Sequence, residues 1–128
     1  MNYYKEKKIS GTFEEAIERV KEELEKEGFG VLTEINVNET FKKKLDVDFR
    51  KYRILGACNA PYAHKAILEE DKVGVMLPCN VIVQELENGE IEVAAVNPIA
   101  SMQSIDNPGL KPIAEEIKAK LDKVISMI

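Results

Sequence analysis

The chain has 128 residues, of which 45% are hydrophobic and 32% are charged, and it carries a net charge of −5 at pH 7. These values are typical of one globular domain and exclude collagen-like, disordered and disulfide-rich chains. The uncharged, hydrophobic stretch 73–83 is too short for a membrane span. The acidic balance argues against nucleic-acid binding, and the basic run 42–44 is expected to be a solvated helix face. No secretory signal is expected, so the predicted location is the cytoplasm.

The N-terminal quarter of the chain predicts a strand and a helix. Residues 3–9 form a short, lysine-rich strand, which suits the edge of a sheet because charge discourages pairing with other chains. Thr12 and Glu15 have the spacing of a capping box. Hydrophobic residues at helical spacing follow, so we expect a helix over 13–27 that ends at Gly28.

Two further strand–helix pairs follow. Residues 30–37 alternate in polarity, which predicts a strand with one face in the core, formed by Val31, Thr33, Ile35 and Val37. Asn38 is placed to cap a short helix. Residues 52–58 predict a third strand, and a helix from Pro61 to Glu70 comes next, because proline is favoured in the first helical turn.

The last third of the chain predicts a hairpin and a final helix. Residues 75–86 give the longest strand signal, and Asn88 with Gly89 is typical of a type I′ turn. The returning strand covers residues 90–96. After a loop, an amphipathic helix begins near Leu110.

The predicted order is therefore β-α-β-α-β-α-β-β-α in a single domain over residues 1–128. The hairpin requires at least one antiparallel pair, and the amphipathic helices need a surface to cover. One mainly antiparallel sheet with helices packed on one face, an α+β fold, satisfies both requirements.

The second face of this sheet is more hydrophobic than a solvated face usually is. If Val31, Ile35 and the valines of the hairpin face the helices, the opposite face carries Leu32, Leu55, Ile82 and Val96. A symmetric homodimer would cover such a face, and we predict one. The alternative is that these are scattered exposed residues, which are common on monomers.

Three segments place chemically capable residues at strand ends, namely residues 56–64, 77–80 and 97–102. Thiolates and an imidazole suit Cu(I) or Zn(II), so Cys58, His64 and Cys79 form a candidate metal site if they converge. Candidate ligand-binding residues beside them are Asn59, Asn80 and Met102. No cofactor is identified by these residues.

Each of these residues also has a purely structural interpretation. Cysteines often fill space in a core, and asparagines often cap helices. The first functional hypothesis is binding of a small ligand or a soft metal near Cys58, His64 and Cys79. A second is thiol-dependent redox or sulfur chemistry at Cys58, where a helix start would favour a thiolate. A third is a protein-interaction module in which the cysteines are structural. Whether any reaction is catalysed is left open by the sequence.

Several motifs, taken together, resemble the "domain of unknown function 302" family. They are the run 30–35, the stretch 41–49, Gly-Ala-Cys-Asn at 56–59 followed by Pro61, Ala63 and His64, and Leu-Pro-Cys-Asn at 77–80. The resemblance covers nearly the whole chain. It implies a small bacterial or archaeal α+β domain with helices on one side of a sheet, and it implies no established reaction.

Overall fold

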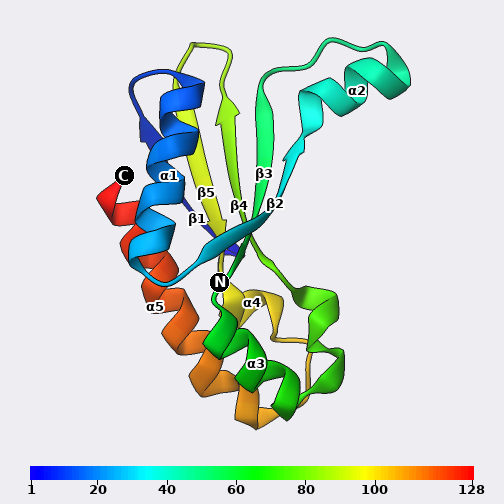
Figure 1. Ribbon diagram of the computed structural model, residues 1–128, viewed down its shortest axis with the longest axis vertical. Helices are drawn as coiled ribbons and strands as arrows, with labels where there is room; N and C mark the ends of the chain where they lie inside the picture. The colour runs from blue at the N-terminus through cyan, green and yellow to red at the C-terminus, as the bar shows by residue number, and fades with distance from the viewer.

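The computed structural model describes residues 1–128 and contains one five-stranded antiparallel sheet with the order β1-β5-β4-β3-β2 (Figure 1). The predicted α+β class is confirmed, and so is the order of the main elements. The strands are β1 (Tyr4–Ile9), β2 (Gly30–Asn36), β3 (Tyr52–Cys58), β4 (Cys79–Glu85) and β5 (Ile91–Val96).

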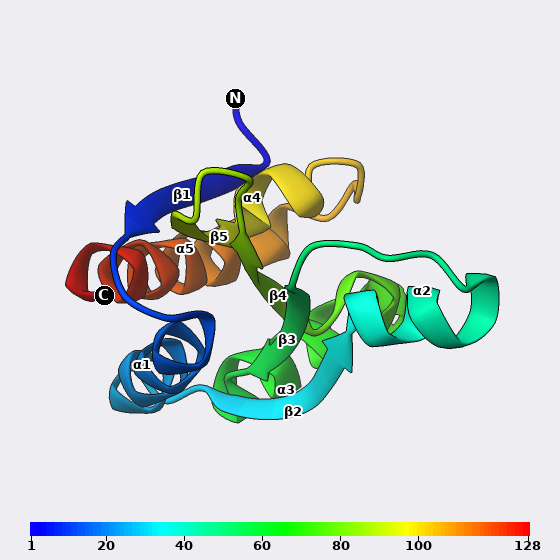
Figure 2. The ribbon, with the colours of Figure 1, turned by 90° about the horizontal axis from the view of Figure 1, so that it is seen from above.

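Two long helices, α1 (Phe13–Lys26) and α5 (Lys111–Met127), lie side by side on one face of the sheet (Figures 1 and 2). Helix α2 (Val37–Leu45) projects on the opposite side. The lower end of the sheet in Figure 1 is closed by α3 (Ala60–Glu69) and α4 (Pro98–Ser101), with two short 3₁₀ helices, η1 (Asp71–Met76) and η2 (Pro108–Leu110). None of the helices is long and apolar enough to cross a membrane.

The main core lies between the sheet and the pair α1 and α5. Alternate residues of β4 and β5 point into it, and the helices supply side chains at helical spacing. Each fully buried aliphatic side chain contributes about 1.5–3 kcal/mol to folding. The fully buried members are Ile17, Val20, Leu24, Leu55, Val81, Val83, Ile91 and Val93, with Leu121, Val124 and Ile125 close to full burial.

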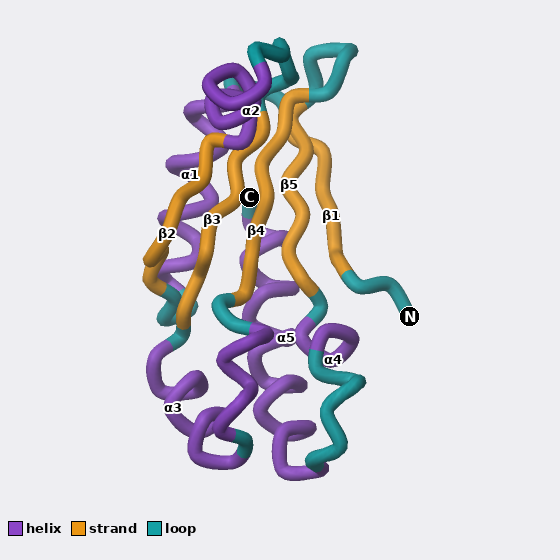
Figure 3. The backbone as a smooth tube through the Cα atoms, turned by 90° about the vertical axis from the view of Figure 1, so that its right-hand side faces the viewer, coloured by secondary structure: helices purple, strands orange, loops and turns teal.

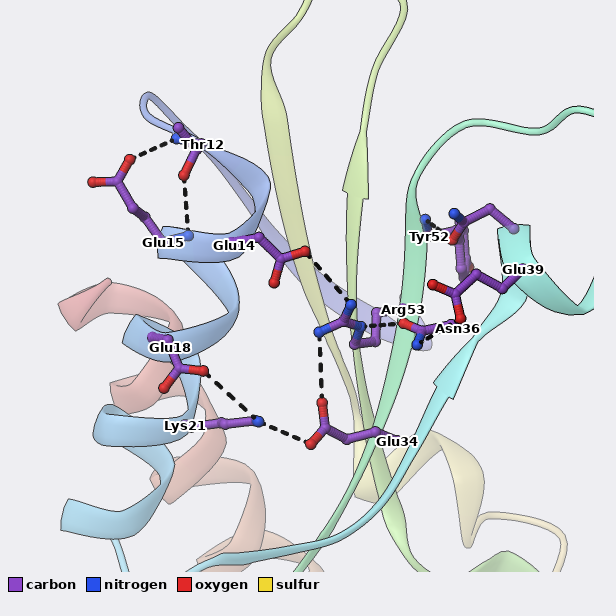
Figure 4. A network of polar contacts seen from close by, with 11 residues as sticks. Thr12, Glu14, Glu15, Glu18, Lys21, Glu34, Asn36, Glu39, Tyr52 and Arg53 are labelled. Atoms are coloured by element: carbon purple, nitrogen blue, oxygen red, sulfur yellow. Dashed lines mark hydrogen bonds and ion pairs between the residues drawn. The ribbon is translucent and has the colours of Figure 1, made fainter.

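Polar contacts fasten α1 to the sheet (Figure 4). The predicted capping box is confirmed: Thr12 Oγ1 accepts from the Glu15 amide, and the Glu15 carboxylate accepts from the Thr12 amide. The guanidinium of Arg53 on β3 lies 3.6 Å from Glu14 and 3.7 Å from Glu34. The Glu14 pair joins α1 to β3, the Glu34 pair joins β2 to β3, and Lys21 of α1 also reaches Glu34 at 2.8 Å.

A β-bulge in β2 overturns the predicted face of Ile35, and the predicted face of Leu55 on β3 is also wrong. The register of β2 on β3 shifts between Val31 and Thr33, so Ile35 pairs with Ile54 and lies on the face away from the helices. Ile35 is 48% exposed, and the expectation that it faces the core is wrong. Leu55 was placed on the second face, yet it pairs with the buried Val81 on the helix-covered face. The bulge explains the position of Ile35, because one extra residue in a strand inverts the alternation of faces beyond it.

Two local assignments also differ from expectation. Helix α2 begins at Val37 after Asn36, and Asn38 accepts a hydrogen bond from the Tyr52 amide instead of capping the helix. The β4–β5 connection has a positive φ at Gly89 but not at Asn88. A type I′ turn requires positive φ at both residues, so that prediction is wrong.

The longest predicted strand is shorter than expected, because residues 75 and 76 belong to η1 and the strand itself starts at Cys79. The predicted loop 97–109 contains α4 and η2. Asn97 and Asn107 begin these two helices, since each side chain accepts a bond from the amide two residues later.

Removal of the Leu55 side chain should show which face of β3 carries the core. We expect Leu55→Ala to lower the free energy of unfolding by about 2–5 kcal/mol, since the side chain is fully buried. Leu68→Ala on α3 is the matched control, because Leu68 is 74% exposed, and a change within about 0.5 kcal/mol is expected. Urea denaturation measures both. Equal effects would place Leu55 outside the core.

Candidate functional site

A pocket of about 270 Å³ lies where the lower end of the sheet meets α3 and α5. Of the 16 residues that line it, 14 are hydrophobic. The strand ends supply one wall, with Ala57, Cys58 and Cys79; β2 supplies Leu32, and Phe29 lies just before β2. The helices supply Tyr62, Ala63, Ala66 and Ile67 from α3, and Ile113, Ala114 and Ile117 from α5. The lining is completed by four residues outside these strands and helices, namely Asn59, Leu77, Pro78 and Met102.

The pocket exists because small side chains stand where larger ones would fill the core. Alanines occur at positions 57, 63, 66 and 114 around it. It also lies between the main core and a small second cluster formed by Ala66, Val73 and Leu110. The two clusters are each packed, and the space between them is left open.

Both cysteines line this pocket, and both are free thiols. Cys79 pairs with Ala57 across β3 and β4, and Cys58 is the next residue of β3. Burial raises the pKa of the Cys79 thiol to about 11, and the nearby Cys58 adds to the shift. Desolvation penalises the thiolate, so Cys79 stays protonated at neutral pH.

Asn59 lies at the edge of the pocket and is the one buried polar residue of the chain, 6% exposed. Its amide nitrogen donates to the Glu27 carbonyl at 3.1 Å. Gly28 stands against this side chain with φ +86°, so a larger residue there would be strained and crowded. Asn59 therefore joins the end of α1 to the start of α3 and positions the pocket wall.

The structure brings together four of the six predicted site residues. Cys58, Asn59, Cys79 and Met102 all line the pocket. The other two residues, His64 and Asn80, do not.

Asn80 lies on the open face of the sheet, in a separate hollow. His64 is exposed on α3. Because the lining residue Tyr62 is two positions earlier, His64 points about 200° away from it around the helix. No group of three or more His, Cys, Asp or Glu side chains could hold a metal ion.

Sequence reasoning missed the helical walls of the pocket. Tyr62 is the one aromatic residue of α3, and the ammonium groups of Lys65 and Lys120 lie 5.3 and 5.8 Å from its ring centroid. A hydrogen bond to Glu116, together with burial, raises the pKa of Tyr62. The usable signal was the set of alanines within otherwise bulky apolar stripes.

Thiol alkylation should distinguish the two cysteines. In a Cys58→Ser variant at pH 8, the remaining Cys79 should react roughly a hundredfold more slowly when folded than in denaturant, because its thiolate is scarce. Iodoacetamide labelling followed by mass spectrometry measures both rates, with Cys79→Ser as the matched variant. Equal folded and denatured rates at Cys79 would contradict the raised pKa.

Comparison with known proteins agrees with this geometry. The sequence matches the family described as "Domain of unknown function DUF302" over residues 5–128. The crystal structure of an uncharacterized conserved DUF302 protein from Bacillus stearothermophilus is 33% identical, with a TM-score of 0.90 over 97% of this chain and 96% of that one. No curated protein matches the sequence. As its motifs predicted, the chain belongs to the DUF302 family.

Proposed function

We propose that this protein binds a small apolar molecule in the pocket between the sheet, α3 and α5. The observation that carries the proposal is a lining in which 14 of 16 residues are hydrophobic, around about 270 Å³. An apolar cavity of about 150 Å³ is already large enough to bind benzene. The volume here equals that of about nine water molecules at ~30 Å³ each, which suits a ligand of similar atom count.

The polar atoms of the site favour an apolar ligand rather than a polar one. No buried side-chain nitrogen or oxygen lacks a hydrogen-bond partner, and the Asn59 amide nitrogen is already bonded to a carbonyl. A ligand that needed hydrogen bonds inside the pocket would meet few free groups. The buried part of the ligand is therefore a short aliphatic chain or a single ring.

The entrance supports the same ligand class. Leu32 and Ile67 line the pocket, yet they are 68% and 45% exposed, so hydrophobic surface continues from the interior to solvent. An apolar molecule would bury this rim as it enters, which adds about 25 cal/mol for each Å² removed from water. The two free cysteines suit a reducing compartment, so we propose that the protein binds its ligand in the cytoplasm. The proposal is for binding, with no reaction assigned.

Titration with 1-octanol tests this proposal. Saturable amide shifts are expected for ¹⁵N-labelled protein at the pocket residues Cys58, Ala63 and Met102. Ala63→Leu should fill part of the pocket and weaken binding at least about tenfold, because a larger side chain displaces the ligand. The matched control is Ala60→Leu, since Ala60 lies on the same helix, is exposed and does not line the pocket.

Two outcomes would reject apolar binding at this site. One is an Ala63→Leu variant that binds octanol as the unmodified protein does while keeping its melting temperature. The other is a set of shifts that follows the open face of the sheet and leaves the pocket amides unchanged.

A soft-metal function is the second candidate, and one observation favours it: Cys58, Cys79 and Met102 bring three sulfur side chains to one pocket. Thiolate and thioether are the ligands that Cu(I) prefers. The raised pKa of Cys79 opposes binding, since a metal must displace the thiol proton. The redox hypothesis for Cys58 stays a prediction that the alkylation experiment addresses.

Anaerobic titration with Cu(I) against a competing chelator tests the soft-metal candidate. We expect one copper ion per chain at neutral pH, loss of uptake in Cys79→Ser, and unchanged uptake in His64→Ala, because His64 lies outside the pocket. Absence of uptake by the unmodified protein, or uptake that survives Cys79→Ser, would remove this candidate.

A further inference from the structure

The face of the sheet opposite α1 and α5 has no helix packed across it, and α2 projects from one end of it (Figure 3). Strand register aligns an apolar row across its centre, formed by Ile35, Ile54, Ile82 and Ala94. Beside this row a hollow of about 450 Å³ opens over β1, β4 and β5. An uncovered sheet face of this kind marks an interaction surface.

The segment of residues 37–51, here called the arm, stands out from the same face (Figures 2 and 3). None of its α2 residues is buried, and Leu45, Val47 and Phe49 are 66%, 46% and 38% exposed. Within the arm, Phe41 packs edge-on against Phe49. The arm is joined to β4 by Arg50, whose Nε donates to the Gln84 side chain. A nine-residue helix is marginal in water without packing, so the arm needs a surface to lie against.

Charge on the arm and on the open face is complementary. The arm has five Lys or Arg residues against three Asp or Glu, whereas the whole chain has a net charge of −5. No salt bridge joins Lys43 or Lys44 to an acidic group of the chain. On the open face, Glu6 and Glu92 are hydrogen-bonded neighbours, and Glu92 raises the pKa of Glu6. The arm thus carries two lysines outside any salt bridge, and the face carries an acidic pair, of which Glu92 also accepts a hydrogen bond from Gln84.

The size of the surface indicates that both parts are needed. Five strands about 4.8 Å apart, each of six or seven residues at about 3.3 Å, give a flat area of roughly 500 Å². A stable interface buries about 800 Å² on each partner. The face alone falls short of this area, and the arm supplies the difference.

We propose that the open face binds a second copy of this chain, with the arm of each protomer seated against the hollow of the other. A two-fold arrangement uses each surface twice, because the same patch must be complementary to itself. It covers the apolar row, packs the exposed arm and brings Lys43 and Lys44 toward the acidic pair. The homodimer predicted from the sequence thereby gains a defined interface.

Sedimentation equilibrium at micromolar concentration tests the proposal, with twice the mass of the chain as the expected result. Leu45→Glu on the arm should raise the dissociation constant at least about thirtyfold, the effect of losing a central contact. Leu68→Glu on α3 is the matched control, since Leu68 is also exposed and lies away from the open face. Neither leucine is buried, so both variants should fold, which circular dichroism checks.

A monomer at every concentration would overturn the proposal and leave the face for a different partner. A dimer that Leu68→Glu weakens and Leu45→Glu does not would place the interface elsewhere. These results do not depend on ligand binding in the pocket, because Leu45 and Leu68 are not among the residues that line it.

Discussion

Helix α5 is longer than the strands it covers, and much of the molecule follows from that mismatch. Its 17 residues span about 25 Å, whereas six-residue strands span about 20 Å. The N-terminal part of α5 therefore extends below the end of the sheet (Figure 1). That apolar surface needs a cover, which α3 and its neighbouring short helices provide. Because they cover it with alanines as well as bulky residues, a pocket remains between the two packed clusters.

Strand β2 connects this pocket to the opposite side of the molecule. Before the bulge, Val31 pairs with Ala57 and packs against the core. After the bulge, Ile35 lies on the open face. A single irregular residue thus directs one half of the strand toward the core and the pocket, and the other half toward the proposed interface. The arm that follows β2 leaves on the open side for the same reason.

Elements with strong local signals were predictable from the sequence. The capping box at Thr12, the helical spacing in α1 and α5 and the alternation in β4 and β5 all gave correct assignments. The bulge was not predictable from the sequence, because it depends on pairing with β3. The predicted face of Ile35 was therefore wrong. The two motifs that contain Cys58 and Cys79 did identify segments that meet at the pocket. That His64 lies outside the pocket depends on the rotation of α3 about its own axis, which only its packing decides.

The neighbour of the first strand in the sheet is the last strand. Ile9 of β1 pairs with Ile91 of β5, and the Lys7 ammonium donates to the carbonyls of Ser126 and Ile128 at the end of α5. During synthesis at roughly 5–20 residues per second, β1 waits roughly 4–16 s for its partner to leave the ribosome. Its three lysines keep this waiting segment hydrated and discourage pairing with other chains until β5 is available.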